Sequence, residues 1–468
     1  MNPFPGLRPF RIDEKYLFFG REEQTAELVQ RLGAKRFLAV VGTSGSGKSS
    51  LVQAWLLPHL YGGTMLDAGF RWELAVMRPG GDPLTHLARA LIDAELYGEV
   101  RESSPFEIRA TLSRSRRGLV EAVRQSSMEA EDNLLVVVDQ FEELFRFRRS
   151  SRSNLEEASA FVKLLIHASQ QTEIPVYIVL TMRSDYLGDC SEFAGLAEAV
   201  NSGEYLIPRL DREQRRTTIA GPIRVGGGEI TSRLLQKLLN DVGDNPDHLP
   251  VLQHALMRTW NCWETERNKD EPLDLHHYEA VGGMEEALSR HADEVFLSLP
   301  DDDHRGVAER LFKALTERGS DGRGIRRPGC LRDLCAVANA DIKTVITIID
   351  QFRQLGRTFL MPGVAVELQQ ETVIDISHES LMRVWLRLKG WVEDESQSAR
   401  IYRRLRETAE LHAEEKAGLY HQPDLEIALS WREESAPNDA WAQQYGGQFA
   451  KTMAFLEESE EAARRTER

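Results

Sequence analysis

A glycine-rich segment near the N-terminus has the spacing best suited to a defined chemistry. Gly42–Ser49 reads GTSGSGKS and fits GxxxxGK[ST]; the apolar run RFLAVV precedes it, and a helical pattern from Ser49 to Leu60 follows. Glycine permits backbone angles and close approaches that a Cβ would block, so successive N–H groups and the helix N-terminus can point at phosphate oxygens. The segment therefore predicts a P-loop that binds nucleotide.

Two side chains of this loop have separate predicted tasks. Lys48 would reach the β and γ phosphates, and the Ser49 hydroxyl would ligand Mg²⁺, so we predict ATP or ADP with Mg²⁺ as the cofactors. The predicted nucleotide-binding residues of the loop are Gly42, Thr43, Ser44, Gly45, Ser46, Gly47, Lys48, Ser49 and Ser50. A chance glycine-rich turn is the alternative, and the strand and helix on either side argue against it.

An acidic cluster follows a second apolar run. Leu134–Val138 reads LLVVV, Asp139 ends it, and Glu142 and Glu143 come three and four residues later. We expect a Walker B strand beside the P-loop strand, with the Asp139 carboxylate holding Mg²⁺ or its waters. Glu143 or Glu142 would be the general base for the attacking water, and the sequence does not choose between them. An exposed acidic helix start is the alternative for this cluster.

A third apolar run ends in a hydroxyl and an arginine. Val176–Thr181 is followed by Met182 and Arg183. A guanidinium at the carboxyl end of a strand lies where ligands of open α/β sheets bind, and it can engage phosphate through two N–H groups. Arg183 is therefore predicted to sense the γ phosphate and to assist catalysis, and an ion pair with Asp185 is the alternative.

These residues need a sheet to bring them together, and the pattern of the chain predicts one. The apolar runs bounded by breakers are Arg36–Val41, Trp72–Met77, Leu134–Val138, Val176–Thr181 and Tyr205–Ile207. Because helical patterns separate them, we expect parallel pairing with right-handed crossovers, and hence a doubly wound α/β sheet of the ASCE type found in P-loop NTPases.

The pattern changes after Pro208, where strand-like runs disappear. Capped amphipathic helices are predicted at Asp211–Ala220, Thr231–Val242 and Val251–Trp263. From about residue 300, helical patterns precede two β-like runs, 358–361 and 372–376, which flank a Pro-Gly turn. Helices followed by a hairpin favour a winged-helix domain.

We therefore divide the chain into five parts: an N-terminal segment (1–35), a P-loop NTPase domain (36–209), a helical domain (210–299), a winged-helix domain (300–395) and a C-terminal helical segment (396–468). The last part carries an apolar stripe at i, i+4 spacing, which we expect to pack against its own domain. Its residues are Trp441, Tyr445, Phe449, Met453 and Leu456.

Composition limits the class of protein. The 468 residues include 58 Lys plus Arg against 74 Asp plus Glu, a formal net charge of -16, which disfavours broad attraction to nucleic acid or to anionic membranes. The four cysteines lack CxxC spacing, and no run approaches the roughly 18 apolar residues of a membrane span. We therefore expect a cytoplasmic protein without a membrane partner, a disulfide framework or a structural zinc site. No repeats are visible.

Taken together, the motifs resemble the STAND NTPases, specifically the bacterial novel-STAND type 1 group, which is related to NACHT and NB-ARC switches. Asn2–Phe10 (NPFPGLRPF) and Phe18–Glu22 (FFGRE) resemble the opening of that group, and the resemblance implies that this segment lies near the adenine. Asp139–Glu143 (DQFEE) resembles the NACHT-type DGhDE pattern, with Gln140 in place of a small residue, and Thr181–Arg183 resembles its sensor Thr-x-Arg.

Two further matches concern the later domains. Leu249–Leu256 (LPVLQHAL) resembles the GLPL-like stretch whose proline packs on the adenine, which implies that role for Pro250. Val373–Leu381 (VIDISHESL) resembles the winged-helix segment whose histidine contacts the β phosphate of ADP, which implies that role for His378.

The resemblance implies a signalling switch with slow ATPase activity. ADP would hold the closed form, ATP would open it, and the open form would assemble into a homo-oligomer or control a partner effector. Effector and sensor parts would be in trans or missing from this chain, and a role in antiphage or stress defence follows by analogy only. The alternatives are an AAA+-like ATP-driven machine and a STAND-type transcriptional regulator. We do not expect nucleic acid, because Asp341–Gly356 is mainly apolar with balanced charge.

Overall fold

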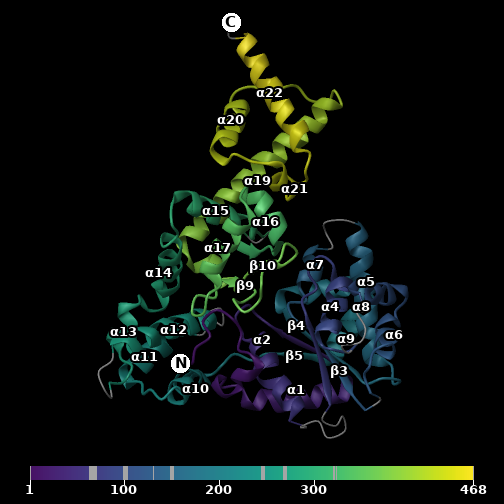
Figure 1. The fold of residues 1–468 in the computed structure, drawn as a ribbon, viewed down its shortest axis with the longest axis vertical. Helices are drawn as coiled ribbons and strands as arrows, with labels where there is room; N and C mark the ends of the chain where they lie inside the picture. The colour runs from purple at the N-terminus through teal and green to yellow at the C-terminus, as the bar shows by residue number, and fades with distance from the viewer. Residues whose placement is uncertain are drawn as a thin grey trace. The chain divides into compact units, whose positions relative to one another are not determined.

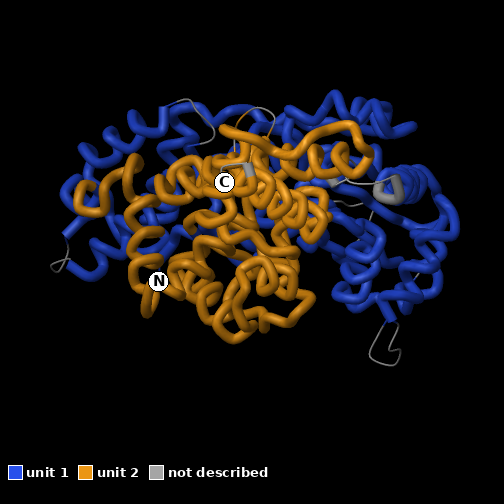
Figure 2. Tube along the Cα trace, turned by 90° about the horizontal axis from the view of Figure 1, so that it is seen from above, with its two compact units in different colours: residues 1–5, 9–278 blue, residues 6–8, 279–468 orange. Residues whose placement is uncertain are grey.

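The computed structural model of the chain (Figure 1) describes residues 2–62, 71–97, 104–129, 131–147, 152–243, 248–266, 271–319, 322 and 324–466. The chain forms two compact units, which Figure 2 shows in two colours. Unit 1 contains residues 1–5 and 9–278, and unit 2 contains residues 6–8 and 279–468. The five-part division of the chain stays a prediction.

A five-stranded parallel sheet forms the centre of unit 1. Its strands are β1 (Phe37–Gly42), β2 (Trp72–Met77), β3 (Asn133–Val138), β4 (Val176–Arg183) and β5 (Glu204–Leu206). Their order is β2-β3-β4-β1-β5, and every pairing is parallel, which confirms the predicted α/β sheet. The expectation that the Asp139 strand lies beside the P-loop strand is wrong, because β4 is inserted between β3 and β1.

The strands are apolar on both faces because helices cover both faces. All six residues of β1 and of β3 are buried. In β1, Leu38 and Val40 contribute to one core, and Phe37, Ala39 and Val41 contribute to the other. This alternation is the period of two expected of a strand between two helical layers.

Helices of unit 1 follow the strands in turn. On the first face lie α1 (Glu22–Lys35) and a continuous helical run formed by α2 (Lys48–Leu51), the π-helical segment η2 (Val52–Leu56) and α3 (Leu57–Tyr61). The second core takes residues from α4 (Pro83–Asp93), α5 (Pro105–Arg114), α6 (Gly118–Arg124), α7 (Glu143–Phe147), α8 (Arg152–Gln170) and α9 (Leu196–Gly203). The short 3-10 helices are η1 (Ile12–Leu17), η5 (Ser184–Tyr186) and η6 (Gly188–Glu192).

Helices follow β5 in the described part of unit 1, as the sequence predicts, with a single isolated β-bridge between Ile230 and Leu273. They are α10 (Arg212–Val225), α11 (Ser232–Val242), α12 (His248–Glu266) and α13 (Leu275–Ala280). The side chains of Asp211 and Thr231 cap α10 and α11 by accepting hydrogen bonds from Gln214 N and Leu234 N. These caps are the start signals that the sequence shows.

Unit 2 begins with α14 (Gly283–Leu297) and α15 (Asp302–Ala314), and continues with α16 (Leu331–Ala338) and α17 (Ile342–Arg353). Its short strands are β6 (Thr316–Arg318), β7 (Gly324–Arg326), β8 (Gly329–Cys330), β9 (Leu360–Met361) and β10 (Val373–Ile376). Strand β10 pairs with β8 on one side and with β9 on the other, both antiparallel, and β6 pairs with β7. The predicted strand pair around residues 358–376 is therefore present.

The C-terminal part of unit 2 is helical, with α18 (Ser380–Val384), α19 (Leu386–Ala413), α20 (Asp424–Ser435), α21 (Asp439–Gln443) and α22 (Phe449–Thr466). Trp441, Tyr445 and Leu456 of the apolar stripe are buried in the core of their own unit, as expected, although Trp441 lies in α21, Tyr445 in the turn after it and Leu456 in α22. The predicted boundary at residue 396 falls inside α19. None of the described helices is long and apolar enough to cross a membrane.

Candidate functional site

The P-loop leaves β1 at Gly42 and enters α2 at Lys48. Gly45 and Gly47 have φ values of 76° and 88°, a left-handed conformation that L side chains rarely adopt. A Cβ on Gly42 would lie 2.7 Å from Ser46 Oγ, so a side chain there would require the Ser46 hydroxyl to move. The backbone of the loop thus favours glycine at two positions of the motif, Gly45 and Gly47.

Lys48 and Ser50 of the loop already form hydrogen bonds. Lys48 Nζ donates hydrogen bonds to the carbonyl oxygens of Gly42 (3.1 Å) and Thr43 (2.7 Å). Ser50 Oγ accepts a hydrogen bond from Phe10 N at 3.2 Å, so this predicted ligand also ties the loop helix to the N-terminal segment. Ser46 Oγ is buried without a hydrogen-bond partner, and Ser44 stays a predicted ligand.

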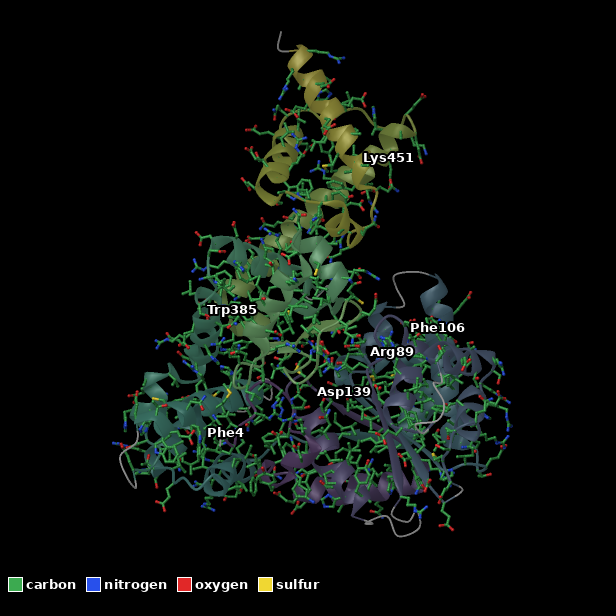
Figure 3. All side chains as sticks on the ribbon, viewed as in Figure 1. Phe4, Arg89, Phe106, Asp139, Trp385 and Lys451 are labelled. Atoms are coloured by element: carbon green, nitrogen blue, oxygen red, sulfur yellow. The ribbon has the colours of Figure 1, made fainter. Side chains whose placement is uncertain are left out.

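Asp139, labelled in Figure 3, joins the P-loop to the centre of the sheet. Its Oδ1 atom accepts hydrogen bonds from Ser49 Oγ (2.7 Å) and Thr181 Oγ1 (2.5 Å). Its Oδ2 atom lies 3.8 Å from Arg78 Nε, at the end of β2. The structure therefore brings both predicted metal ligands, Ser49 and Asp139, into direct contact.

The two candidate bases have different surroundings. Glu142 is buried, and burial raises the pKa of its carboxyl, with the nearby charge of Asp139 adding to this rise and those of Lys48 and Arg146 opposing it. Its Oε2 atom accepts a hydrogen bond from Arg183 N at 3.3 Å. Glu143 is also buried, but its Oε2 atom accepts the N–H of Gly80 at 3.2 Å, on the loop after β2.

Arg183 ends β4 and pairs with Gly42 in the register of β1 and β4, so it stands level with the start of the P-loop. Its guanidinium forms an ion pair with Asp185, which is the alternative that the sequence raised, and its Cζ lies 5.8 Å from the centre of the Tyr186 ring. The side chain is 10% exposed, whereas that of Asp185 is 51% exposed, so the pair lies at the edge of the solvent.

A cavity of about 510 Å³ opens beside the loop within unit 1. It is lined by Arg21, Gly42, Thr43, Ser46, Ser184, Leu206, Ile207, Pro208, Arg209, Leu210, Arg215, Val242, Gly243 and Leu249. Burial lowers the pKa of Arg21 to about 10, and its guanidinium donates to Pro208 O (2.7 Å) and Ser46 O (3.4 Å). Pro250, in α12, follows the lining residue Leu249 but is not itself part of this lining.

His378 lies in unit 2, between β10 and α18, and is partly buried. Its Nδ1 atom accepts the N–H of Ser380 at 3.1 Å, and Ser380 Oγ lies 2.9 Å from the same nitrogen. Because Nδ1 is an acceptor, the neutral ring carries its proton on Nε2, which can donate. Strand β10, just before it, is held by the buried ion pair of Arg326 with Asp375, at 2.7 Å.

These residues fit a nucleotide and a divalent cation. The Ser49 hydroxyl oxygen and a carboxylate oxygen of Asp139 are in contact. Oxygen ligands of these two kinds bind Mg²⁺ beside a P-loop. Gly47 has nothing within 4 Å of its Cβ position, so the turn before α2 is open to a ligand. The buried, unpartnered hydroxyl of Ser46 and the cavity beside it leave further polar groups for such a ligand.

Sequence reasoning missed Arg78 and gave Thr181 no role of its own, although both contact Asp139. A signal for Arg78 exists, because it directly follows the apolar run Trp72–Met77, as Arg183 ends the run that becomes β4. The carboxyl ends of parallel strands meet at the same edge of a sheet, so Arg78 and Arg183 are both candidates for the functional site on this ground.

A family model described as Novel STAND NTPase 1 matches residues 3–418. No curated protein matches significantly. Among solved structures, the chain is distantly similar to the Aeropyrum pernix ORC2 protein in ADPNP-ADP complexes, with 11% identity, 83% of this chain and 95% of that chain covered, and a TM-score of 0.44. It is also distantly similar to Cdc6p from Pyrobaculum aerophilum, with 14% identity, 80% of this chain and 94% of that chain covered, and a TM-score of 0.35.

Proposed function

This chain belongs to the novel STAND NTPase 1 family, and from that premise we propose that it is an ATP- and ADP-dependent signalling switch with slow hydrolysis. The observation that carries the proposal is the hydrogen bond of 2.7 Å between Ser49 Oγ and Asp139 Oδ1. It places a P-loop hydroxyl and a Walker B carboxylate at one point, which a nucleotide-bound metal requires.

The residues around this point have complementary roles in the proposal. Ser49 and Asp139 hold Mg²⁺, which when bound would neutralise phosphate charge. Lys48 leaves the carbonyl oxygens of its own loop and binds the β and γ phosphates, and the loop N–H groups bind phosphate oxygens. Arg183, level with Gly42, exchanges its exposed partner Asp185 for the terminal phosphate.

We assign the general base to Glu142 in preference to Glu143. The charge of Glu142 interacts with those of Lys48 and Asp139, so its carboxylate lies near the predicted phosphate and metal ligands. Burial raises its pKa, which suits a proton acceptor. Both glutamates are buried, and each uses one carboxylate oxygen to accept a backbone N–H, that of Arg183 for Glu142 and that of Gly80 for Glu143. The assignment therefore rests on the charges that act on Glu142.

The cavity beside the P-loop supports a base-binding role for the N-terminal segment. Arg21, in the FFGRE motif, lines this cavity together with Pro208 and Leu249, and apolar side chains form much of the rest. A planar, largely apolar base with a few polar edges suits such a lining. Pro250 would contribute from the start of α12, next to Leu249.

The switching step is assigned to unit 2. Helices α15, α16 and α17 with the antiparallel sheet β8-β10-β9 support a winged-helix domain, which would present His378 to ADP. The Nε2–H of His378 is a donor suited to a β-phosphate oxygen. ADP would thus hold the closed form, and ATP would favour an open form that assembles into oligomers or acts on an effector. Antiphage or stress defence is proposed by family analogy alone.

The test is to identify the nucleotide that purifies with the full chain and with Lys48→Ala and His378→Ala variants. We expect ADP in the wild type, little nucleotide with Lys48→Ala and weakened ADP retention with His378→Ala. Lys35→Ala and His421→Ala, at exposed positions, are the matched controls. If His378→Ala holds ADP as firmly as the wild type, the ADP-closed switch loses its support, and nucleotide binding is then judged on Lys48→Ala alone.

A further inference from the structure

We propose that Arg78 is the counter-ion of Asp139 when no divalent cation is bound, and that its side chain withdraws when such a cation binds. The inference rests on the proposed function, because it concerns the regulation of the same nucleotide and metal site. It adds a competing cation that the protein itself supplies.

The fold places Arg78 beside Asp139. Strands β2 and β3 pair with Met77 opposite Val138, and Asp139 N donates a hydrogen bond to Met77 O at 2.8 Å. The residues that follow these two strand ends, Arg78 and Asp139, are therefore neighbours. Arg78 Nε lies 3.8 Å from Asp139 Oδ2, within ion-pair distance.

The Asp139 carboxylate needs a cation. It is 5% exposed, and the two donors on its Oδ1 atom are the neutral hydroxyls of Ser49 and Thr181. Its charge also acts unfavourably on buried Glu142 nearby. A buried carboxylate without a counter-charge is costly, and the ion pair that the described residues give Asp139 is the one with Arg78.

The loop that carries Arg78 is held at several points. His86 Nδ1 lies within hydrogen-bond distance of the carbonyl oxygens of Arg78 (3.1 Å) and Pro79 (2.9 Å). Gly80 N donates to Glu143 Oε2, and Gly80 has a φ of 53°, with its Cβ position only 2.7 Å from His86 Cε1. The Arg78 side chain, by contrast, is 33% exposed. Because the backbone of the loop is held, withdrawal from Asp139 is a movement of the side chain.

Arg78 and Mg²⁺ would compete for the Asp139 carboxylate, and their charges decide which one binds. Mg²⁺ binds carboxylate oxygens at roughly 2.1 Å and carries twice the charge of a guanidinium, so both cations cannot share the carboxylate without repulsion. A metal held by Ser49 and Asp139 would therefore repel Arg78, and we expect this repulsion to release the guanidinium from Asp139 Oδ2. Removal of Arg78 should consequently strengthen metal binding, whereas removal of an arginine that served the phosphates would weaken nucleotide binding.

The experiment is isothermal titration of the full chain, after removal of the nucleotide that purifies with it, with ADP at a series of Mg²⁺ concentrations, for the wild type, Arg78→Ala, Arg78→Lys and Arg89→Ala. Arg89 is exposed on α4, the helix after the same loop, and is labelled in Figure 3. We expect the half-saturating Mg²⁺ concentration to fall about fivefold in Arg78→Ala. Arg78→Lys should stay within about twofold of the wild type, and Arg89→Ala should not differ.

A half-saturating Mg²⁺ concentration that is unchanged or higher in Arg78→Ala overturns the inference. Should Arg78→Ala fail to fold, Arg78→Gln gives the same test with a side chain that can still hydrogen-bond. Lys48→Ala distinguishes a failure of the proposed nucleotide site from a failure of the role proposed for Arg78. If Lys48→Ala binds ADP like the wild type, the proposed nucleotide site is wrong; if it loses ADP while Arg78→Ala shows no shift, only the role of Arg78 is wrong.

Discussion

Arg183 stands opposite Gly42 in the parallel pairing of β4 with β1, so the last residue of one strand is level with the first residue of the P-loop. This relationship depends on the strand order, because β4 lies between β1 and β3. The inserted strand also places Thr181 against Asp139, at 2.5 Å. A single strand thus brings the predicted sensor arginine to the P-loop and the Thr181 hydroxyl to the predicted metal ligand Asp139.

The first prediction concerns the specificity of Arg183 for ATP. Arg183→Ala should weaken ATP binding about tenfold and ADP binding by less than about threefold, because the guanidinium is proposed to bind only the terminal phosphate. Fluorescence or calorimetric titration with both nucleotides, in the presence of Mg²⁺, measures the two constants. Asp185→Ala is the matched control, since it removes the ion-pair partner and leaves the guanidinium. An equal loss for ATP and ADP in Arg183→Ala would exclude a sensor role.

The second prediction separates the two glutamates. Glu142→Gln should lower the rate of ATP hydrolysis at least about 100-fold and keep nucleotide binding, because a neutral amide cannot accept the proton of water. Glu143→Gln should lower the rate by less than about tenfold, because its structural role at the Gly80 N–H tolerates an amide oxygen. Single-turnover hydrolysis with bound ATP measures both. The opposite ranking of the two variants would transfer the role of base to Glu143.

The third prediction concerns Gln140, where the family pattern has a small residue. Gln140 has a φ of 58°, and an L side chain in this conformation costs roughly 1 kcal/mol, which glycine does not incur. Gln140→Gly should therefore leave the free energy of unfolding within about 1 kcal/mol of the wild type, since the greater freedom of the unfolded chain offsets the relief. Gln397→Gly, at an exposed position inside α19, should cost about 1 kcal/mol. Denaturant unfolding measures both.

Comparable losses for Gln140→Gly and Gln397→Gly would show that the left-handed backbone at Gln140 carries no strain. Gln140→Val gives a second check, because a β-branched side chain is disfavoured at positive φ. It should destabilise the chain more than Gln140→Gly does.

Local sequence patterns predicted much of the fold correctly. The apolar runs that form β1 and β3 are continuous because both faces of the sheet are covered. The N-cap residues Asp211 and Thr231 mark the starts of their helices in the sequence. Strand order could not be derived in this way, because β3 and β4 have equally apolar sequences and pairing depends on contacts far apart in the chain.

The candidate site was likewise predicted in part. Ser49 and Asp139 were predicted from spacing, and the structure brings them within 2.7 Å. The choice between Glu142 and Glu143 depends on where two adjacent side chains point, and Arg78 depends on the pairing of β2 with β3. Neither relationship has a local sequence signal strong enough to settle it.

The last prediction concerns a pair of carboxyl groups at the start of α4. Asp82 caps the helix by accepting the N–H of Thr85 at 3.1 Å, and Arg109 lies between Asp82 (3.6 Å) and Glu157 (3.5 Å). Burial, together with the neighbouring Asp82, raises the pKa of Glu157 to about 7. Burial also acts to raise the pKa of Asp82, but hydrogen bonds with Glu157 and Thr85 outweigh it, so that this pKa is lowered. Glu157 Oε1 is buried without a donor, and protonation of Glu157 supplies a proton to share with Asp82.

The sign of the pH dependence follows from these shifts. Because the pKa of Glu157 in the folded state lies above its value of 4.5 in the unfolded chain, the folded state binds the extra proton. The stability that protonated Glu157 contributes is complete below about pH 4.5 and is lost as the pH rises through about 7. The lowered pKa of Asp82 acts in the opposite sense, but below its ordinary value of 3.8, outside this window.

Glu157→Gln tests this pair, because the amide keeps a donor for Asp82 at every pH. The melting temperature of Glu157→Gln should equal that of the wild type at pH 5 and exceed it by about 2 °C at pH 8. Glu156→Gln, at the exposed neighbouring position, should show no such pH-dependent difference. Thermal unfolding of the three proteins between pH 5 and pH 8 measures it. A difference between Glu157→Gln and the wild type that is constant with pH would mean that Glu157 stays ionised in the folded state.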